Sequence, residues 1–477
     1  MSGSTNGIDP RAVQDEFKGT DLGDKRLERR VLEILPRIAA APGDSFPEQM
    51  ASVAEREALY RFLANPKVTM EGLLAGHVRA THERIRGRSL VRVIHDTSPF
   101  RFAGDREGLG VIRGDTKGFF AHTSLAIAAD ETREPLGVLA LLPYARLDEA
   151  TMHRRGLTNT ERQRLTVAKP REEKESSRWE RQAKGVSAGL PEGTRAIHVM
   201  DQEADSYDLL GELLSAELDF VVRADPNRRT KDNYGASVIV GKKPASLFRT
   251  VQLNPRAKHR HNTATLPARG ERTAHLEVRW ASITLSRQRH NQCEAGEIVI
   301  NAVHVTEPNP PPGEPAVEWM LLTTEPVDSL EEATAVVDHY RARWIIEEYF
   351  KALKTGCKLE SRQLTSFDGL TRALALFVPV AWHLLLLRHL GREEPSRPAT
   401  AVLDVEQLLL LRALLDKRRY KLPTVPTVRD VMLGVAALGG HIKNNGDPGW
   451  LVLGRGFTRF VEADEIWRMA RERNDQS

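Results

Sequence analysis

The spacing of apolar residues divides the chain into two helical ends and a strand-rich centre. From residue 12 to about residue 86, apolar residues recur at helical spacing, and Leu22 or Asp24 is the predicted start of one helix. At Ser89 the pattern changes to the alternation typical of strands. Residues 365–477 return to helical spacing. The pattern therefore predicts an α/β centre between two helical regions.

The central segments place two aspartates after strands. SLVRVIHDTS alternates and is predicted as a strand that ends on Asp96, and the next two apolar runs, Phe119–Asp130 and Glu134–Arg146, are predicted as a β-hairpin. A charged interval, 151–185, is predicted as a long loop that leads into a helix at KESSRWERQAKG. Two further strands follow, one ending on Asp201 and the other being DFVVRAD. Strands and helices therefore alternate after the hairpin.

Residues 226–325 are predicted as a separate β-rich segment, because ERTAHLEVRWASITL and EIVINAVHVTE both alternate. The run HYRARWIIEEYFKALKTG then predicts a helix. On a helix with 3.6 residues per turn its Tyr340, Arg343, Glu347 and Lys354 share one face. Glu348 lies about 100° from that face. The alternative is a solvated charged face with ion pairs such as Glu347 with Lys351.

Composition restricts the class of protein. The 477 residues exceed one ordinary core and predict roughly two to four domains. The net charge is +4 with a pI near 9.0, which allows basic patches that face a polyanion. Cys293 and Cys357 lack metal-ligand spacing, which favours a reducing cytoplasm over a disulfide scaffold or zinc module. The N-terminus lacks the apolar core of a signal peptide.

The most hydrophobic run, Ala373 to Leu390, is interrupted by polar and helix-bending residues, namely Pro379, His383 and Arg388. It is too short for a clean membrane span of about 20 apolar residues. We therefore expect a buried helix and no membrane partner.

Three acids stand out by their predicted positions. Asp96 and Asp201 follow strands, and Glu347 lies on a helix beyond the β-rich segment. Taken singly, an aspartate after a strand is more often a helix cap or a turn residue. Together, two strand carboxylates and one helix carboxylate can hold two Mg²⁺ ions about 3.5–4 Å apart, with Mn²⁺ as a substitute. Their order, after a β-hairpin and within alternating strands and helices, indicates a ribonuclease-H-like core for phosphodiester chemistry.

At these residues the chain resembles a known family, the bacterial cut-and-paste DDE transposases of the insertion-sequence-four group, and most closely the transposon-five transposase. The signature Tyr-x2-Arg-x3-Glu-x6-Lys is matched by Tyr340, Arg343, Glu347 and Lys354. The resemblance runs from about residue 20 to residue 365 and is weak beyond. Other similar segments are VIHDTS, KESSRW, VMDQEAD, FVVR, WMLLTTEPVDSL and ALYRFLANPKV.

The resemblance implies roles for individual residues. Asp96, Asp201 and Glu347 would be the catalytic, metal-binding triad. Trp319 would stack against a flipped base, which compensates for the lost stacking in DNA. The other implied DNA contacts are Tyr340, Arg343, Lys354, Arg223, Lys351, Arg26, Arg30 and Arg61.

The resemblance also implies an α/β, ribonuclease-H-like mixed sheet with a β-rich insertion and flanking helical domains. Its parts would be a helical end-binding domain (1–86), a catalytic core in two parts (87–225 and 326–365), the insertion (226–325) and a helical dimerisation region (366–477). The partners would be double-stranded DNA with terminal inverted repeats, target DNA and a second copy in a synaptic homodimer.

The function implied is cut-and-paste transposition by two-metal phosphoryl transfer. Water would nick the transposon end, the freed 3′-OH would form a hairpin, and the reopened end would join target DNA. Two alternatives remain at this point: a ribonuclease-H-like nuclease that cuts without joining, and a catalytically silent DNA-binding inhibitor of transposition.

Overall fold

The computed structural model describes residues 10–146, 157–158, 161, 174–226, 228, 230, 244–252, 271–287, 291–294, 296–418, 420–442 and 446–475. Two compact units make up the chain. The first comprises residues 1–87, 97–158 and 345–477, and the second comprises residues 88–96 and 159–344. Two of the crossings between units fall inside regular elements, after Asp96 in a strand and after Trp344 at the start of a helix. Each unit is described separately below.

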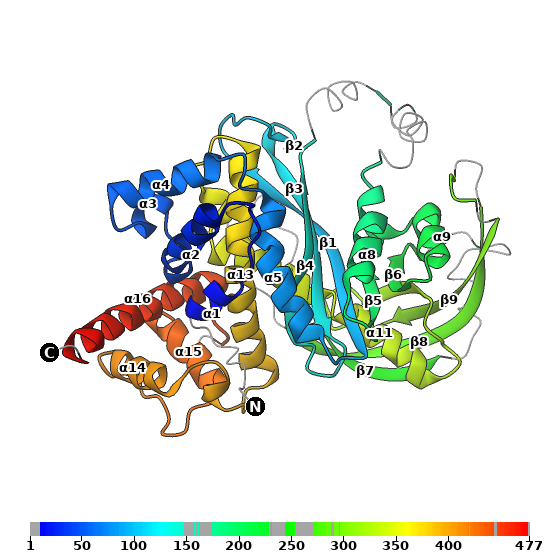
Figure 1. Ribbon diagram of the computed structural model, residues 1–477. Coiled ribbons are helices and arrows are strands. Elements are labelled where there is room, and N and C mark those ends of the chain that lie inside the picture. The colour runs from blue at the N-terminus through cyan, green and yellow to red at the C-terminus, as the bar shows by residue number, and fades with distance from the viewer. Residues whose placement is uncertain are drawn as a thin grey trace. The chain divides into compact units, whose positions relative to one another are not determined.

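The second unit is built on a mixed sheet (Figure 1). Its strand order is β1-β5-β6-β10-β9-β8-β7. β1, β5 and β6 run parallel, whereas β10, β9, β8 and β7 continue the sheet in antiparallel pairs. The bounds are β1 Leu90–Phe102, β5 Arg195–Met200, β6 Asp219–Ala224, β7 Ala245–Gln252, β8 Glu271–Ser286, β9 Glu297–Thr306 and β10 Glu318–Thr323.

Helices pack on both faces of this sheet. Ser187 of α8 (Ser177–Gly189) bonds to His198 on β5, and His198 in turn bonds to His95 on β1. Arg92 on β1 instead donates to His339 of α11 (Leu330–Arg341). Because successive side chains of a strand point to opposite faces, α8 and α11 lie on opposite faces. The α8 face also carries α9 (Tyr207–Ser215) and a buried cluster whose largest members include Trp179, Tyr207 and Phe220.

The strands of the first unit form a hairpin beside the second half of β1. β3 (Thr116–Ala128) pairs antiparallel with β4 (Pro135–Tyr144) and with the short β2 (Gly110–Arg113), and β1 is its other neighbour in the sheet order. The Phe119 ring stacks on Phe100 and Phe102 of β1 at centroid distances of 5.4 and 5.6 Å.

The helices of the first unit come from both ends of the chain. Asp24 caps α2 by accepting a hydrogen bond from the Arg26 amide, so the second of the two predicted starts is confirmed. The helix bounds are α1 Pro10–Asp15, α2 Lys25–Ala40, α3 Phe46–Gln49, α4 Val53–Ala64, α5 Met70–Ile85, α12 Trp344–Lys351, α13 Phe367–Glu393, α14 Val405–Asp416, α15 Val428–Leu438 and α16 Trp450–Asp475.

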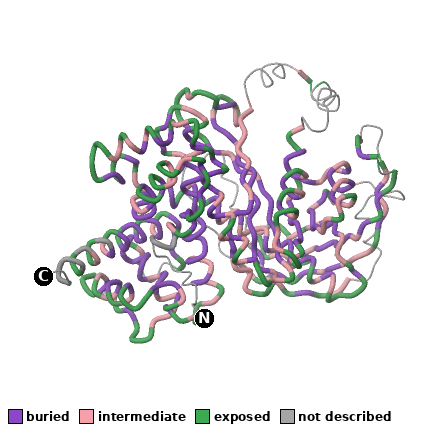
Figure 2. Tube along the Cα trace, in the orientation of Figure 1, coloured by how far each residue is buried: buried purple, intermediate pink, exposed green. Residues whose placement is uncertain are grey.

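The long helix α13 forms the centre of the first unit. By length and composition it could cross a membrane, but its most apolar 18-residue window is 100% buried inside the protein. Figure 2 shows the buried residues that run along it. It packs against α5, β4 and α15. α13 is therefore the buried helix predicted from the run Ala373 to Leu390.

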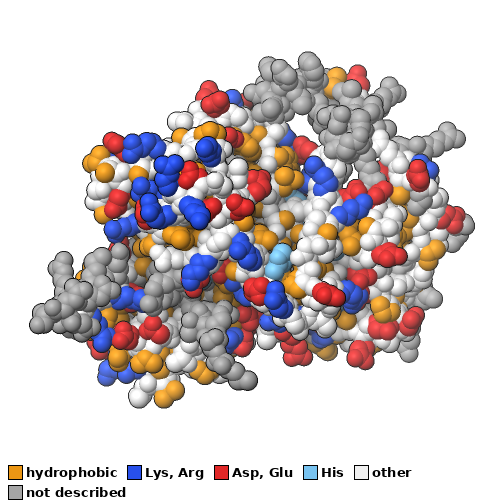
Figure 3. Space-filling model, viewed as in Figure 1, with side chains coloured by type: hydrophobic (Ala, Val, Ile, Leu, Met, Phe, Trp, Pro, Cys, Tyr) orange, Lys and Arg blue, Asp and Glu red, His pale blue; other side chains and the backbone are white. Residues whose placement is uncertain are grey.

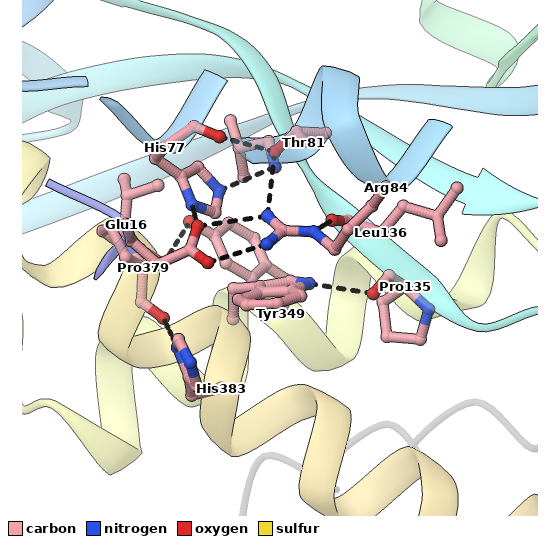
Figure 4. Close-up of polar contacts among 12 residues, drawn as sticks. Glu16, His77, Thr81, Arg84, Pro135, Leu136, Tyr349, Pro379 and His383 are labelled. Carbon is pink, nitrogen blue, oxygen red and sulfur yellow. Dashed lines mark hydrogen bonds and ion pairs between the residues drawn. The ribbon is translucent and has the colours of Figure 1, made fainter. Parts of the chain in front are cut away.

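A buried polar network joins α5 to β4 and to the residue after α1 (Figure 4). Arg84 donates to both carboxylate oxygens of Glu16 and lies over the Trp382 ring at 4.0 Å. His77 accepts a hydrogen bond from the Val138 amide at Nε2, so its proton is on Nδ1 and faces Glu16 at 2.5 Å. This network attaches the N-terminal segment to the strand hairpin.

The predicted fold class is confirmed. A hairpin (β3 and β4) beside β1, followed by β5 and β6 parallel to β1, is the ribonuclease-H-like arrangement, and helical regions occupy both ends of the sequence. The predicted five-part domain division stays a prediction. Most of the predicted loop before α8 lies outside the described residues, namely residues 151–156, 159–160 and 162–173, as do parts of the predicted insertion.

Two details of the prediction are wrong. Asp96 lies inside β1 rather than at its end, because the strand continues to Phe102. The helix predicted for residues 339–356 is divided in the structure. α11 ends at Arg341, α12 begins at Trp344, and residues Ala352–Gly356 are π-helical. Because the helical phase changes at both breaks, a 3.6-residue period cannot place Tyr340, Glu347 and Lys354 on one face.

Candidate active site

Asp96 and Asp201 occupy matching positions on two neighbouring parallel strands. The register of β1 and β5 pairs Val93 with His198 and Ile94 with Val199, and each aspartate lies two residues beyond the second pair. The backbone at Asp201 remains extended after β5 ends, with φ −85° and ψ −171°. Neighbouring strands lie about 4.8 Å apart, and in-register residues project on the same face. The second unit therefore brings the two carboxylates together on the face that α11 covers.

Both carboxylates have local partners that fix their positions. Asp96 is 9% exposed, and Arg343 Nη1 lies 3.4 Å from its Oδ2. Arg343 itself follows α11, where its amide bonds to the Tyr340 carbonyl. Asp201 begins a short 3₁₀ turn (Gln202–Ala204) by accepting a hydrogen bond from the Glu203 amide at 2.9 Å. Asp201 therefore does act as a cap, which was the alternative role weighed for such an aspartate.

Four predicted DNA-contacting residues lie in the same unit. The Trp319 ring, on β10, meets the Tyr340 ring edge-on at a centroid distance of 5.3 Å and an interplanar angle of 65°. Burial raises the pKa of Tyr340, while the charges of Arg343 and Arg223 oppose that rise. Asp201 also acts on this pKa and raises it. The second unit thus groups Trp319, Tyr340, Arg343 and Arg223 with the two aspartates.

Glu347 and Glu348 have different surroundings in the first unit. Glu348 accepts hydrogen bonds from Lys351 Nζ at 2.6 Å, Arg388 Nη1 at 2.5 Å and Trp450 Nε1 at 3.2 Å. Burial opposes ionisation of Glu348, but Arg388 and Lys351 lower its pKa below the ordinary value. Glu347 lies in the first turn of α12 and is half-buried. The Glu348 carboxylate is thus engaged in the protein interior, whereas the assignment of Glu347 as a metal ligand stays a prediction.

Lys354 lies in the π-helical segment and contacts the second half of β1. Its Nζ donates to Ser98 Oγ at 2.7 Å and lies 5.0 Å from the centre of the Phe100 ring. Ser98 comes two residues after Asp96 on the strand and is buried. Sequence reasoning missed Ser98, because VIHDTS shows a serine after the aspartate but not what its hydroxyl meets.

The predicted end-binding arginines lie on two N-terminal helices. Arg26 and Arg30 are exposed on α2, and Arg61 is exposed on α4. Figure 3 shows Lys and Arg side chains gathered on the face over these helices. Such a surface suits a phosphate backbone, which is bound by cations that need not read the base sequence.

The two strand aspartates have the chemistry of a site for a divalent cation. Two ionised carboxylates at strand spacing repel each other, and a cation between them removes the repulsion. Mg²⁺ prefers hard oxygen ligands and is commonly held by one or two carboxylates plus substrate phosphates. Within the described residues, no group of three or more His, Cys, Asp or Glu side chains is placed to hold a metal ion. Glu347, the third predicted ligand, belongs to the other unit.

Two family models match this chain. One is described as transposase DNA-binding and matches residues 10–68, and the other is described as transposase DDE domain and matches residues 153–378. These matches support a DDE-type transposase. The DNA-binding match covers α1 to α4 and the exposed arginines on α2 and α4. The DDE match covers Asp201 and Glu347, whereas Asp96 precedes it.

One solved structure is also similar to this chain. It is a cryo-EM structure of the piggyBac transposase synaptic complex with hairpin DNA, at 12% sequence identity and a TM-score of 0.40. The similarity covers 90% of this chain and 86% of the other.

Proposed function

We propose that this DNA transposase performs cut-and-paste transposition by two-metal phosphoryl transfer. Asp96, Asp201 and Glu347 would be the ligands of the metal ions. The observation that supports this most directly is the register of β1 and β5, which sets Asp96 beside Asp201 on the α11 face. The signature around Glu347 supports membership of the insertion-sequence-four group, closest to the transposon-five transposase. Mg²⁺ is the proposed ion, with Mn²⁺ as a substitute.

When bound, the two ions would supply an activated attacking oxygen and stabilise the leaving oxygen. The chain's own residues position the DNA and neutralise its charge. Arg343 and Lys354 carry the positive charge that a scissile phosphate requires, and the Tyr340 hydroxyl can donate to a phosphate oxygen. Arg223 would bind the adjacent phosphate. Trp319, half-buried beside Tyr340, would stack on a base turned out of the helix.

Four steps make up the proposed reaction. Water attacks phosphorus at the transposon end and the bond to the transposon 3′ oxygen breaks, which leaves a 3′-OH. That hydroxyl attacks the opposite strand, and a hairpin forms as the flanking DNA leaves. Water reopens the hairpin and restores the 3′-OH. This hydroxyl finally attacks a target phosphate, and the bond from that phosphorus to the target 3′ oxygen breaks as the end is joined to target DNA.

The proposed partners are duplex DNA with terminal inverted repeats, target DNA and a second copy of this chain. Arg26, Arg30 and Arg61 would hold the repeat, and Lys351 would add a weaker contact. The helical C-terminal region would supply the contact between copies in a synaptic homodimer.

The test is an in vitro reaction with the full chain, Mg²⁺ and labelled DNA that carries the element's own ends. We expect nicked, hairpin and joined products, and we expect Asp201→Asn to abolish all three while it retains end binding in a gel-shift assay. The matched control is Glu192→Gln, which removes an exposed carboxylate before the opposite end of β5.

Each failure has a distinct meaning. Cleavage without joining would indicate a nuclease, and binding without cleavage would indicate a silent inhibitor. Full activity of the Asp201→Asn protein would refute the assignment of the triad.

A further inference from the structure

Glu348 receives more polar contacts than a surface glutamate on a short helix requires. Its side chain is 14% exposed, and its three donors come from α12 itself, from α13 and from the first residue of α16. Arg388 also lies 4.9 Å from the centre of the Trp450 ring and donates to the Pro448 carbonyl at 3.4 Å. The carboxylate, the guanidinium and the indole thus form one connected group inside the first unit.

This group contacts α12, a segment that is too short to be stable as an isolated helix. α12 has only 8 residues, which is below the length at which a helix is stable alone. It continues directly into the π-helical residues Ala352–Gly356, a rare conformation that occurs mostly as single turns within α-helices. Apolar contacts of Ile346, Tyr349 and Phe350 bury one face of α12. Apolar contacts allow α12 to slide or rotate against its neighbours. A carboxylate that accepts three directional hydrogen bonds also fixes the rotation of α12 about its axis.

α16 contacts both ends of this segment. Trp450 bonds to Glu348 near the start, and Gly454 lies against the Gly356 carbonyl at the end. A Cβ at Gly454 would be 3.1 Å from that oxygen. Glu347 immediately precedes Glu348, and Lys354 lies between the two contacts. The proposed metal ligand and the proposed phosphate-binding lysine therefore share a backbone segment whose two ends both contact α16.

We infer that Glu348 is a positioning residue, which fixes α12 on α13 and α16 so that the C-terminal helices set the positions of Glu347 and Lys354. This inference rests on the proposed function, because it assigns Glu348 a part in the same reaction. It also gives the adjacent glutamates separate roles, one toward the metal and the other toward the protein interior.

Two variants separate positioning from general stability. Glu348→Gln keeps the shape but removes the charge and turns amide protons toward donors, and Trp450→Phe keeps the ring but removes its N–H. The matched control is Glu393→Gln, which breaks another pair of α13, with Arg133 at 3.1 Å. All proteins are compared as full chains for end binding, cleavage at saturating DNA, Mg²⁺ dependence and amide hydrogen exchange.

We expect end binding within twofold of the parent protein for all three variants. Glu348→Gln should slow cleavage at least tenfold and raise the Mg²⁺ concentration for half-maximal rate, and Trp450→Phe should do so more weakly. Amides of residues 345–356 should exchange faster in both proteins while those of α5 do not. Glu393→Gln should match the parent protein throughout.

The results that would refute the role of Glu348 differ from those that would refute the proposed function. If the parent protein cleaves and both variants cleave equally well at the same Mg²⁺ concentration, the inference is wrong. If the parent protein does not cleave, the proposed function fails, and hydrogen exchange still decides the role of Glu348. If the amides of residues 345–356 exchange as slowly in Glu348→Gln as in the parent protein, the positioning role of Glu348 is wrong. A uniform loss of protection, binding and cleavage would show a structural role only.

Discussion

The position of the Lys354 ammonium group depends on Ser98, a residue that neither its charge nor the sequence motif singles out. Its ammonium group donates to Ser98 Oγ at 2.7 Å, and both groups lie in the first unit. A lysine has a flexible stem with large rotamer entropy, so a fixed acceptor restricts where the charge sits. Ser98 therefore sets the position of the proposed phosphate-binding cation.

We predict that Ser98→Ala slows DNA cleavage about tenfold, because a hydrogen bond to a charged group contributes roughly 1.5–3 kcal/mol. The measurement is the single-turnover cleavage rate at saturating DNA. Ser98→Thr keeps the hydroxyl and should restore most of the rate. Equal rates for the alanine variant and the parent protein would show that Lys354 needs no such acceptor.

Two C-terminal helices of the first unit cross so closely that only glycine fits. A Cβ at Gly456 of α16 would lie 1.8 Å from the Val435 carbonyl oxygen of α15, and one at Gly439 would lie 1.9 Å from the Val452 carbonyl. Backbone atoms cannot give way as a flexible side chain can. The crossing therefore depends on the absence of these two side chains.

We predict that Gly456→Ala lowers the free energy of unfolding of the first unit by about 1–3 kcal/mol, as overpacking does. Gly185 in α8 of the second unit is the comparison position, because a Cβ there meets no atom within 4 Å. Gly185→Ala should stabilise by about 0.5–1 kcal/mol through helix propensity. Urea unfolding monitored by circular dichroism measures both. Unchanged stability of Gly456→Ala would mean that α15 and α16 can move apart with no cost in the free energy of unfolding.

At the scale of an element, the helix predicted for residues 339–356 is divided into separate segments, and hydrophobic periodicity did not predict these breaks. No glycine or proline marks the break between Arg341 and Trp344. The turn forms where the Arg343 amide bonds to the Tyr340 carbonyl, three residues back. The π-helical segment Ala352–Gly356 lies against α13 and α16. Tertiary packing, which a local pattern does not contain, decides both features.

For the molecule as a whole, several histidines are buried in the neutral state. Burial lowers the pKa of His198 to about 4, of His383 to about 4 and of His339 to about 3, with Arg92 also lowering the last. Burial lowers the pKa of His77 as well, although Glu16 opposes it. In the unfolded chain these imidazoles return to about 6.5.

We predict that the stability of the chain falls as the pH drops below about 6.5. Above that pH the histidines are neutral in both states, so they contribute no pH dependence. Below it the unfolded chain binds protons that the folded chain cannot, and each histidine lowers the free energy of unfolding by up to about 1.4 kcal/mol per pH unit.

The lowered pKa of Glu16 adds a loss of the same sign below about 4.3, where the unfolded carboxylate protonates. Urea unfolding at a series of pH values from about 8 to about 3 measures the slope in both ranges. A free energy of unfolding that is flat between pH 7 and pH 5 would show that these side chains are not buried in the neutral state.

The sequence by itself determined the order of elements, the fold class and the candidate acids. Alternation marked β1, and apolar runs marked the hairpin. The helical ends followed from their apolar period, and the capping aspartate of α2 was one of two positions predicted for its start. A signature of four spaced residues singled out Glu347 from Glu348. These features are local, so a local pattern can record them.

Only the tertiary structure decided which groups meet. The register that sets Asp96 beside Asp201 joins strands about a hundred residues apart, and the contacts of Glu348 with Arg388 and Trp450 join three helices. The strand extension past Asp96, the break before α12 and the acceptor for Lys354 were likewise absent from the sequence pattern. Hydrogen bonds and close approaches between distant segments depend on packing geometry, which single-sequence spacing does not encode.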